Sequence, residues 1–184
     1  MKKIPCLFKK EYIGQKSNIL NEVTLGCEWV MDGNGIATIK YDGTACMIRS
    51  GKMYKRYDAK QGKTPPDNWI SCQPFPDEIT KHWPGWIEVG DEPESKWHRD
   101  VPYTYLSDGT YELIGLKINS NPYNLTVHHL VPHGLPISKT IIRTFEGIKC
   151  FLKDFNHEGI VFHHEDGRMV KIRRKDFGFD WPIK

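Results

Sequence analysis

Short apolar runs, several of them alternating with polar residues, recur along the chain and predict β-strands. The turns at Asp42-Gly43 and Ser50-Gly51, and the hairpin turn over residues 164–167, favour antiparallel pairing of the strands that they join. The predicted strands lie at residues 35–58 (two or three strands), 86–89, 110–118, 127–131, 159–163 and 168–173.

One segment, residues 139–153, has the periodicity of a helix, with Ser138 as its expected N-cap. Six apolar residues fall on one face there: Ile141, Ile142, Phe145, Ile148, Phe151 and Leu152. Residues 1–34 are mixed and predict a short strand with a connecting helix or loop, and the prolines within 62–85 predict an irregular segment. The pattern therefore predicts an α+β fold built on antiparallel sheets with few helices, as one domain over residues 1–184.

Composition narrows the function only a little. A formal net charge of +3 permits nucleic-acid binding without requiring it, because the clustering of Lys and Arg matters more than the total. The five cysteines form no C-x-x-C pair, which argues against a zinc site or disulfide framework and for a reducing compartment. No leader-like or membrane-spanning apolar run is present. We expect a cytoplasmic protein, with nuclear access left open, that needs no membrane and no obligate protein partner.

The candidate chemistry starts at Lys40, in the sequence Lys-x-Asp-Gly formed with Asp42 and Gly43. A lysine placed where an apolar strand turns is unusual for so strongly hydrated a cation, and suggests an amine presented to a ligand. We take Lys40 as a candidate nucleophile toward a nucleotide phosphate. Composition alone yields about 0.1 such motifs by chance, so the rest of the chain has to decide.

An amine that attacks the α-phosphate of ATP needs a lowered pKa, a metal ion on the triphosphate and further cations for the developing charge. Glu158 offers a hard oxygen ligand for Mg²⁺, and Lys171 and Arg173 share one face of the last strand. Glu112 would accept hydrogen bonds from the ribose hydroxyls. Taken singly, each residue is better explained as a solvated or edge-protecting position. Their fixed order along the chain favours the functional interpretation.

That order, Lys-x-Asp-Gly, Tyr-Glu-Leu-Ile-Gly, Glu-Gly-Ile-Val-Phe and Val-Lys-Ile-Arg, resembles the covalent nucleotidyltransferases, which include the ATP-dependent RNA and DNA ligases and the mRNA capping enzymes. Three longer stretches resemble the vertebrate-type 5′-to-3′ RNA ligases more narrowly: 39–47, 112–134 and 158–183. The resemblance covers nearly the whole chain. It implies a nucleotidyltransferase (ATP-grasp-like) fold.

The resemblance also implies roles for individual residues. Lys40 would become lysyl-AMP, with Asp42 and Gly43 shaping its turn. Glu158 would help to hold Mg²⁺ or Mn²⁺, and Lys171 would bind the α-phosphate. The two remaining assignments are the nucleoside contact of Glu112 and the contact of Arg56 with the ribose or the substrate phosphate.

Two departures from the family pattern stand out. The last motif of the family is usually Lys-x-Lys, whereas here Arg173 replaces the second lysine. Arginine keeps the positive charge but cannot act as an acid or base, so Arg173 suits only the electrostatic stabilisation of a phosphate. Larger members continue past the Trp-Pro-Ile sequence near residue 183, so we expect a minimal core without an appended C-terminal domain, as in compact viral enzymes. RNA would then be held by the core itself, through Lys60, Lys63 and Arg174.

The sequence thus predicts an ATP-dependent RNA ligase that joins a 5′-phosphate to a 3′-hydroxyl through lysyl-AMP and RNA-adenylate. Two alternatives remain open at this point. One is another enzyme of the same superfamily, either a DNA ligase or a GTP-dependent capping enzyme. The other is a non-catalytic RNA-binding module that keeps the fold.

Overall fold

The computed structural model describes residues 2–14, 16–78 and 80–183, and the chain forms two compact units. The first unit, the inserted unit, consists of Met1–Lys3 and Asp42–Pro132. The second, the lysine unit, consists of Ile4–Tyr41 and His133–Lys184. The chain therefore passes between the units directly after Tyr41, two residues before Gly43.

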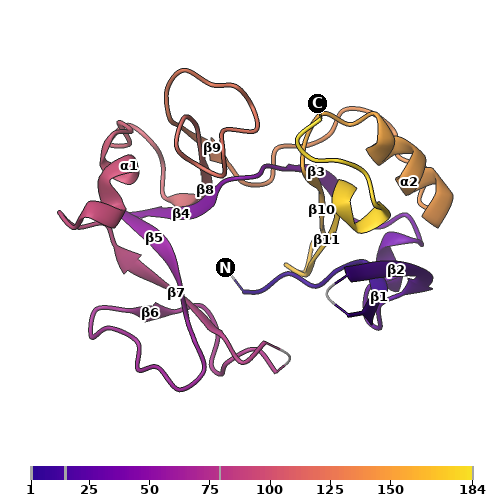
Figure 1. Ribbon diagram of the computed structural model, residues 1–184, viewed down its shortest axis with the longest axis horizontal. Coiled ribbons are helices and arrows are strands. Elements are labelled where there is room, and N and C mark those ends of the chain that lie inside the picture. Colours follow the sequence, from indigo (N-terminus) through magenta and orange to yellow (C-terminus); the bar gives the residue numbers. More distant parts are fainter. Residues whose placement is uncertain (1, 15, 79, 184) are drawn as a thin grey trace. The chain divides into compact units, whose positions relative to one another are not determined.

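The lysine unit is built from two antiparallel sheets and one helix (Figure 1). Its central three-stranded sheet has the order β11-β10-β3, and a separate hairpin pairs β1 with β2. The bounds are β1 Phe8–Ile13, β2 Lys16–Val23, β3 Ile36–Lys40, α2 Phe145–Lys153, β10 Gly159–His163 and β11 Met169–Arg173. Two short 3₁₀ helices, η1 Glu28–Val30 and η3 Arg174–Phe177, complete the unit.

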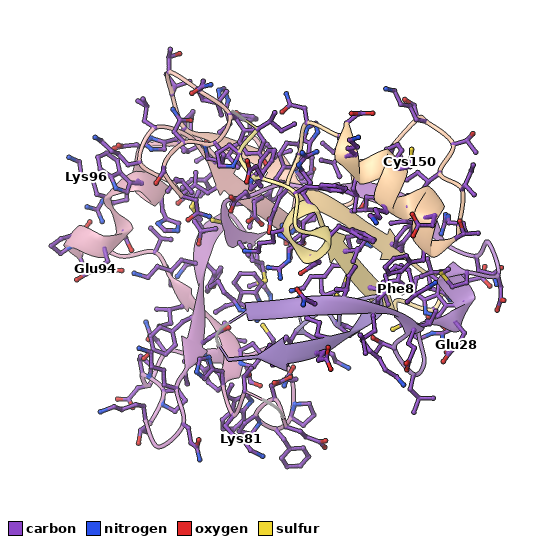
Figure 2. All side chains as sticks on the ribbon, turned by 45° about the vertical axis from the view of Figure 1, so that its right-hand side comes forward. Phe8, Glu28, Lys81, Glu94, Lys96 and Cys150 are labelled. Carbon is purple, nitrogen blue, oxygen red and sulfur yellow. The ribbon has the colours of Figure 1, made fainter. Side chains whose placement is uncertain are left out.

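One face of the three-stranded sheet forms the core of the lysine unit. Ile160 and Phe162 alternate along β10 and are fully buried, and Ile172 lies opposite Ile160 on β11. Phe8, labelled in Figure 2, and Leu152 of α2 belong to the same apolar cluster. Because side chains alternate across a strand, the residues between these positions are turned to the other face of the sheet.

The inserted unit contains a six-stranded antiparallel sheet with the order β6-β7-β5-β4-β8-β9. Its core face carries Cys46, Ile48, Met53 and Leu113, all nearly inaccessible to solvent. The bounds are β4 Thr44–Arg49, β5 Lys52–Ala59, β6 Ile70–Ser71, β7 Trp83–Glu88, β8 Gly109–Ile114 and β9 His129–Pro132. A 3₁₀ turn, η2 Pro93–Ser95, leads into the four-residue helix α1 Lys96–Arg99.

The prediction of an α+β fold made mainly of antiparallel sheet is confirmed. The main error concerns the helix predicted from residue 139, because α2 begins only at Phe145. Thr144, not Ser138, is its N-cap, and its side chain accepts a hydrogen bond from the N–H of Gly147 at 3.0 Å. Ile141 is buried in the core from a segment without regular secondary structure, so its apolar character reflects packing and not helical periodicity.

Two smaller differences follow from turn geometry. The strand expected over 110–118 ends at Ile114, because Gly115 has a φ of +143° and the chain then turns. Residues 1–34, expected to give one strand and a helix or loop, supply the whole β1-β2 hairpin and η1. None of the helices among the described residues is long and apolar enough to cross a membrane.

Candidate active site

The face of the three-stranded sheet opposite the core carries Lys40, Lys171 and Arg173, and we call it the lysine face. Gly159 on the central strand pairs with Lys40 on one side and with Arg173 on the other. Val161, two residues further along, pairs with Lys171. Paired residues and residues two apart point to the same face, so the register brings the three cations together from two separate parts of the sequence.

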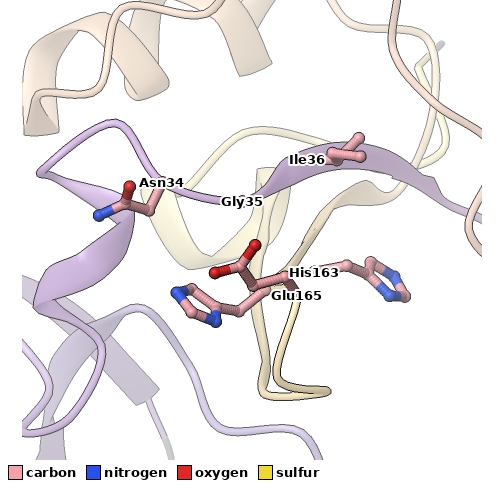
Figure 3. A pocket seen from close by; sticks show the side chains of 6 residues that line it. Asn34, Gly35, Ile36, His163 and Glu165 are labelled. Carbon is pink, nitrogen blue, oxygen red and sulfur yellow. The ribbon is translucent and has the colours of Figure 1, made fainter.

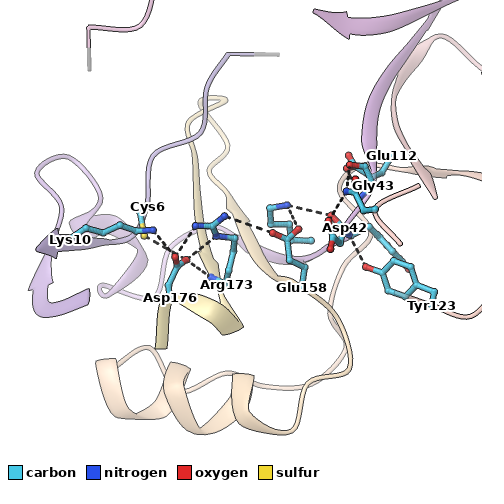
Figure 4. Close-up of polar contacts among 12 residues, drawn as sticks. Cys6, Lys10, Asp42, Gly43, Glu112, Tyr123, Glu158, Arg173 and Asp176 are labelled. Carbon is cyan, nitrogen blue, oxygen red and sulfur yellow. Dashed lines mark hydrogen bonds and ion pairs between the residues drawn. The ribbon is translucent and has the colours of Figure 1, made fainter. Parts of the chain in front are cut away.

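Glu158 lies directly before β10 and supplies the negative charge for this face. Its carboxylate contacts the ammonium of Lys40 (Figure 4). Only 6% of Glu158 is exposed. Lys40 Nζ also donates to the carbonyl of Tyr41 at 3.3 Å. The next residue must be glycine, because a Cβ on Gly159 would lie 2.3 Å from the carbonyl oxygen of Ile172. The Glu-Gly pair therefore combines a buried carboxylate with a close strand contact.

Lys171 has the clearest electrostatic perturbation of the predicted site residues. Burial, followed by the positive charges of Lys40 and Arg173, lowers its pKa to about 8, although Glu158 and Asp176 act in the opposite direction. A lysine held in this way carries its charge at neutral pH at some cost to the fold. Such a group gains from the arrival of an anion, which suits the phosphate contact expected for Lys171.

Arg173 is held by Asp176, a residue that the sequence interpretation did not include. Arg173 Nη2 lies 2.9 Å from Asp176 Oδ1, and Lys10 Nζ from β1 lies 2.6 Å from the same oxygen (Figure 4). Burial alone would raise the pKa of Asp176, but hydrogen bonds from Arg173 and Lys10 lower it. Asp176 follows Arg173 by three residues at the start of η3, which is the spacing of a helix-capping pair. This spacing was a signal in the sequence for the contact between the two residues. The contribution of Lys10 gave no signal in the sequence.

In the inserted unit, hydrogen bonds hold the Asp42-Gly43 turn. The N–H of Gly43 donates to Glu112 Oε1 at 3.1 Å, and the N–H of Asp42 donates to the hydroxyl of Tyr123 at 2.7 Å. Asn119 Nδ2 donates to Asp42 Oδ1 at 2.8 Å and to the carbonyl of Gly43 at 2.9 Å. We call these five residues the turn group. Asn119 and Tyr123 lie within the stretch that resembles the RNA ligases, but were given no role.

Gly43 is required by the packing of this turn. A Cβ there would lie 2.2 Å from the carbonyl oxygen of Leu113 on β8, which a backbone atom cannot avoid by a rotamer change. The strand register also places Glu112 opposite Ala45, and Ala45 next to Arg56 on β5. Glu112 and Arg56 thus share one face of the six-stranded sheet, with a small residue between them.

Arg56 is already in contact with protein groups. Its Nε donates to Asp58 Oδ1 at 2.5 Å, and its guanidinium lies 5.7 Å from the ring centroid of Trp86, a cation–π distance. Trp86 is only 3% exposed, so it packs in the protein instead of presenting a face for a base. Arg56 remains half-buried beside the row that carries Glu112.

The three residues expected to contact RNA fall into two classes. Lys60 and Lys63 are exposed in the loop after β5. Arg174 is 5% exposed, and its guanidinium donates to the carbonyls of Lys153 at 2.9 Å, Phe155 at 3.0 Å and Asp180 at 2.9 Å. It therefore caps the end of α2 and is not placed for the expected RNA contact. The alternation that puts Arg173 on the lysine face puts Arg174 on the side of the core.

No group of three or more His, Cys, Asp or Glu residues within the described part of the chain is arranged to hold a metal ion. Glu158 thus offers a single carboxylate, which suits Mg²⁺ bound jointly with substrate phosphates. A hollow in the lysine unit is lined by residues 34–36 and 163–165 (Figure 3). It lies toward the other end of β3, where Ile36 pairs with His163, and contains none of the predicted site residues.

Comparison with known proteins gives consistent matches. A family model described as RNA ligase 1 matches residues 88–184, more than half of the chain. The RNA ligase 1 proteins of Rattus norvegicus and Mus musculus are each 28% identical over 275 residues, covering 99% of this chain and 82% of the relative. RNA ligase 1 of Danio rerio is 26% identical over 267 residues, covering 98% and 82%.

These alignments are longer than the 184 residues of the chain, so they contain gaps. Much of the additional length of the relatives therefore lies within the matched span. The sequence interpretation had placed the difference in length after the Trp-Pro-Ile sequence near residue 183.

Proposed function

The chain belongs to the RNA ligase 1 family, and from that premise we propose that it is an ATP-dependent RNA ligase. In this proposal Lys40 forms a covalent bond to AMP, and the protein then joins an RNA 5′-phosphate to a 3′-hydroxyl. The observation that carries the proposal is the lysine face. Its register places Lys40, Lys171 and Arg173 together, with Glu158 in contact with the nucleophile.

The first step is attack by neutral Lys40 Nζ on the α-phosphorus of ATP. A P–N bond forms, the bond to the β-phosphate oxygen breaks and pyrophosphate leaves. Lys40 has to lose a proton first, and its amine contacts the Glu158 carboxylate. Lys171 and Arg173 supply positive charge for the phosphate oxygens during the transfer.

Glu158 is the residue that would hold Mg²⁺ or Mn²⁺, which offsets the charge of the triphosphate when bound. The same carboxylate contacts the Lys40 side chain, so a bound metal ion and Lys40 would compete for one group. In the second step an oxygen of the RNA 5′-phosphate attacks the lysyl-AMP phosphorus and the P–N bond breaks. In the third step an RNA 3′-hydroxyl attacks the 5′-phosphorus, and AMP leaves.

The remaining roles are proposed from the family resemblance. Glu112 contacts the nucleoside and Arg56 contacts the ribose or the substrate phosphate, consistent with their place in one row of their sheet. Lys60 and Lys63 are exposed and contact the RNA backbone. We further propose that the chain has the nucleotidyltransferase fold of its superfamily, with the two compact units acting as one adenylyltransferase domain.

The decisive experiment incubates the protein with ATP labelled at either the α- or the γ-phosphate, in the presence of Mg²⁺ or Mn²⁺. Label from the α-position should stay on the protein after denaturation, and peptide mapping should locate it at Lys40. Label from the γ-position should not be retained. Lys40→Ala should remove the adduct, whereas Lys149→Ala on the surface of α2 should retain it.

The absence of an adduct with either metal would contradict the proposal. Two further arms separate the alternatives. Retained label from GTP in place of ATP would indicate a capping-type enzyme. Joining of DNA ends in preference to RNA ends would indicate a DNA ligase, and RNA binding without an adduct would indicate a non-catalytic module.

A further inference from the structure

We propose that Asp176, supported by Lys10, is a positioning residue that fixes the guanidinium of Arg173 on the lysine face. The inference rests on the proposed function, because it concerns how Arg173 is presented to the transferred phosphate. It also explains why arginine stands where the superfamily usually has a second lysine.

The contact between Asp176 and Arg173 is bidentate and includes the backbone. Asp176 Oδ2 accepts from the N–H of Arg173 at 2.9 Å and from its Nε at 3.1 Å. Asp176 Oδ1 accepts from Nη2 at 2.9 Å. Two parallel hydrogen bonds fix both the position and the plane of a guanidinium, which a single bond would not.

Asp176 itself is fixed from a second direction. Its side chain is only 2% exposed, and Lys10 Nζ lies 2.6 Å from Oδ1. A buried carboxylate is costly unless it is paired and hydrogen-bonded, and the two cations meet that requirement. Lys10 belongs to the β1-β2 hairpin, so a separate structural element supports the anchor. The carboxylate is thus a rigid attachment point.

The other end of Arg173 points to the proposed chemistry. Its Nη1 lies 4.0 Å from Glu158 Oε1, and Glu158 contacts the nucleophile Lys40. Charges therefore alternate in sign along a chain of five side chains: Lys10, Asp176, Arg173, Glu158 and Lys40. Nε and Nη2 bond to Asp176, which leaves Nη1 as the nitrogen presented at the lysine face.

This arrangement requires an arginine. A lysine at position 173 would present one ammonium on a flexible stem, and would not bond to both Asp176 oxygens while also facing Glu158. The departure from Lys-x-Lys is thus coupled to Asp176, three residues further along. The coupling predicts that substitutions at positions 173 and 176 have non-additive effects on AMP transfer.

The test is a double-mutant cycle on single-turnover AMP transfer from ATP to the protein. Asp176→Asn and Arg173→Lys should each slow the transfer by about 10-fold, in line with the cost of misplacing a catalytic group. The double variant should be no slower than Arg173→Lys alone, because Asp176 acts through the arginine. Asp166→Asn breaks an exposed Arg–Asp pair at the other end of the same hairpin, and should leave the rate unchanged.

A second measurement does not depend on catalysis. The NMR signal of the Arg173 Nε–H, assigned by its loss in Arg173→Lys, should exchange slowly with solvent in the wild type and in Asp166→Asn. It should exchange rapidly in Asp176→Asn. If the wild type transfers no AMP but this signal is protected, the proposed function fails while the anchor stands.

Three outcomes would overturn the positioning role. One is a wild-type rate in Asp176→Asn, and another is an equal slowing by Asp176→Asn in both the wild-type and the R173K backgrounds. Lys10→Met serves as a milder variant should Asp176→Asn fail to fold. Lys10→Met should raise the exchange rate of the Nε–H and slow AMP transfer. The third contradicting outcome is wild-type behaviour in Lys10→Met together with wild-type AMP transfer in Arg173→Lys.

Discussion

The two sheets that carry the candidate residues have the same layout but differ in how their polar faces are held. Each sheet buries one face in its own core and turns the other face toward polar groups. On the lysine face, charged side chains hold one another through ion pairs. In the turn group, hydrogen bonds to Tyr123, Glu112 and Asn119 fix the main chain at Asp42 and Gly43.

The difference separates two tasks, one in each unit. Charge on the lysine face is suited to phosphate chemistry, because the strand register places Lys40, Lys171 and Arg173 together there. The turn group fixes the path of the chain immediately after the nucleophile. Substitutions on the lysine face should therefore change rates strongly, and substitutions in the turn group should change them weakly.

After loss of the nucleophile itself, the largest effect is expected at Glu158. Replacement by glutamine removes the charge that contacts Lys40 and would hold the metal, so AMP transfer should slow by about 10²- to 10³-fold. Single-turnover labelling at several Mg²⁺ concentrations measures the effect. Glu146→Gln, on the exposed surface of α2, is the matched control and should be neutral. A wild-type rate in Glu158→Gln would remove the proposed division of tasks.

Arg174→Met should act on stability instead of RNA binding. Loss of the guanidinium leaves several carbonyls at the end of α2 without their donor, which should cost about 3 kcal/mol of unfolding free energy. Urea denaturation measures this loss. The salt dependence of RNA binding should be unchanged, whereas Lys60→Ala should lower its logarithmic slope by about 1. A lowered slope in Arg174→Met would restore the RNA contact expected from the sequence.

The pKa of Lys171, lowered by burial and by its cationic neighbours to about 8, predicts a pH-dependent affinity for ATP. Lys171 is charged below this pH and neutral above it, so affinity should fall by about 10-fold between pH 7 and pH 9. The measurement uses Lys40→Arg, which keeps the neighbouring charge but cannot form the adduct. Adding Lys171→Arg should flatten the profile, and an equally steep profile there would assign the titration to another group.

The same lowered pKa has a consequence for stability. Between pH 8 and the usual lysine pKa of 10.5, the unfolded chain binds the proton that folded Lys171 has lost. The contribution of Lys171 to the free energy of unfolding should therefore rise with pH across this window, which means that the folded protein gains stability. Lys171→Met should remove this rise in chemical denaturation at pH 8 and pH 10. Stability curves of equal slope in the two proteins would contradict the assignment.

The smallest effect is expected in the turn group. Tyr123→Phe removes the acceptor for the N–H of Asp42, a loss of about 1 kcal/mol. AMP transfer should slow by only about 5-fold. Tyr105→Phe, on an exposed tyrosine of the same unit, provides the control. A loss as large as that of Glu158→Gln would show that the turn is as important as the charged face.

The sequence was most informative about the lysine face. Register and alternation within short strands are local properties, so the common face of Lys171 and Arg173 followed from their spacing. The contact of Lys40 with Glu158 joins residues 118 positions apart, and the sequence predicted a metal-holding role for Glu158 instead of this contact. The functional roles of these residues stay predictions.

Other parts of the site depend on packing that a single sequence does not specify. Lys10 reaches Asp176 because the β1-β2 hairpin lies beside η3, and residues 1–34 had no pattern from which to expect that hairpin. Asn119 and Tyr123 lie in an irregular loop, where neither the helical nor the strand periodicity of apolar residues applies. The run Arg173-Arg174-Lys175 reads as uniformly basic, yet burial divides it among three environments.

The insertion of residues 42–132 into the lysine unit has a consequence during synthesis on the ribosome. β3, which carries Lys40, pairs with β10, and the first residue of β10 emerges 119 residues later. At ordinary translation speeds that delay is on the order of ten seconds, far longer than hairpin formation. The sheet of the inserted unit is complete at residue 132, before β10 has been made. The strand of the nucleophile must therefore wait, and the later strands β10 and β11 complete the sheet on which Lys40 lies.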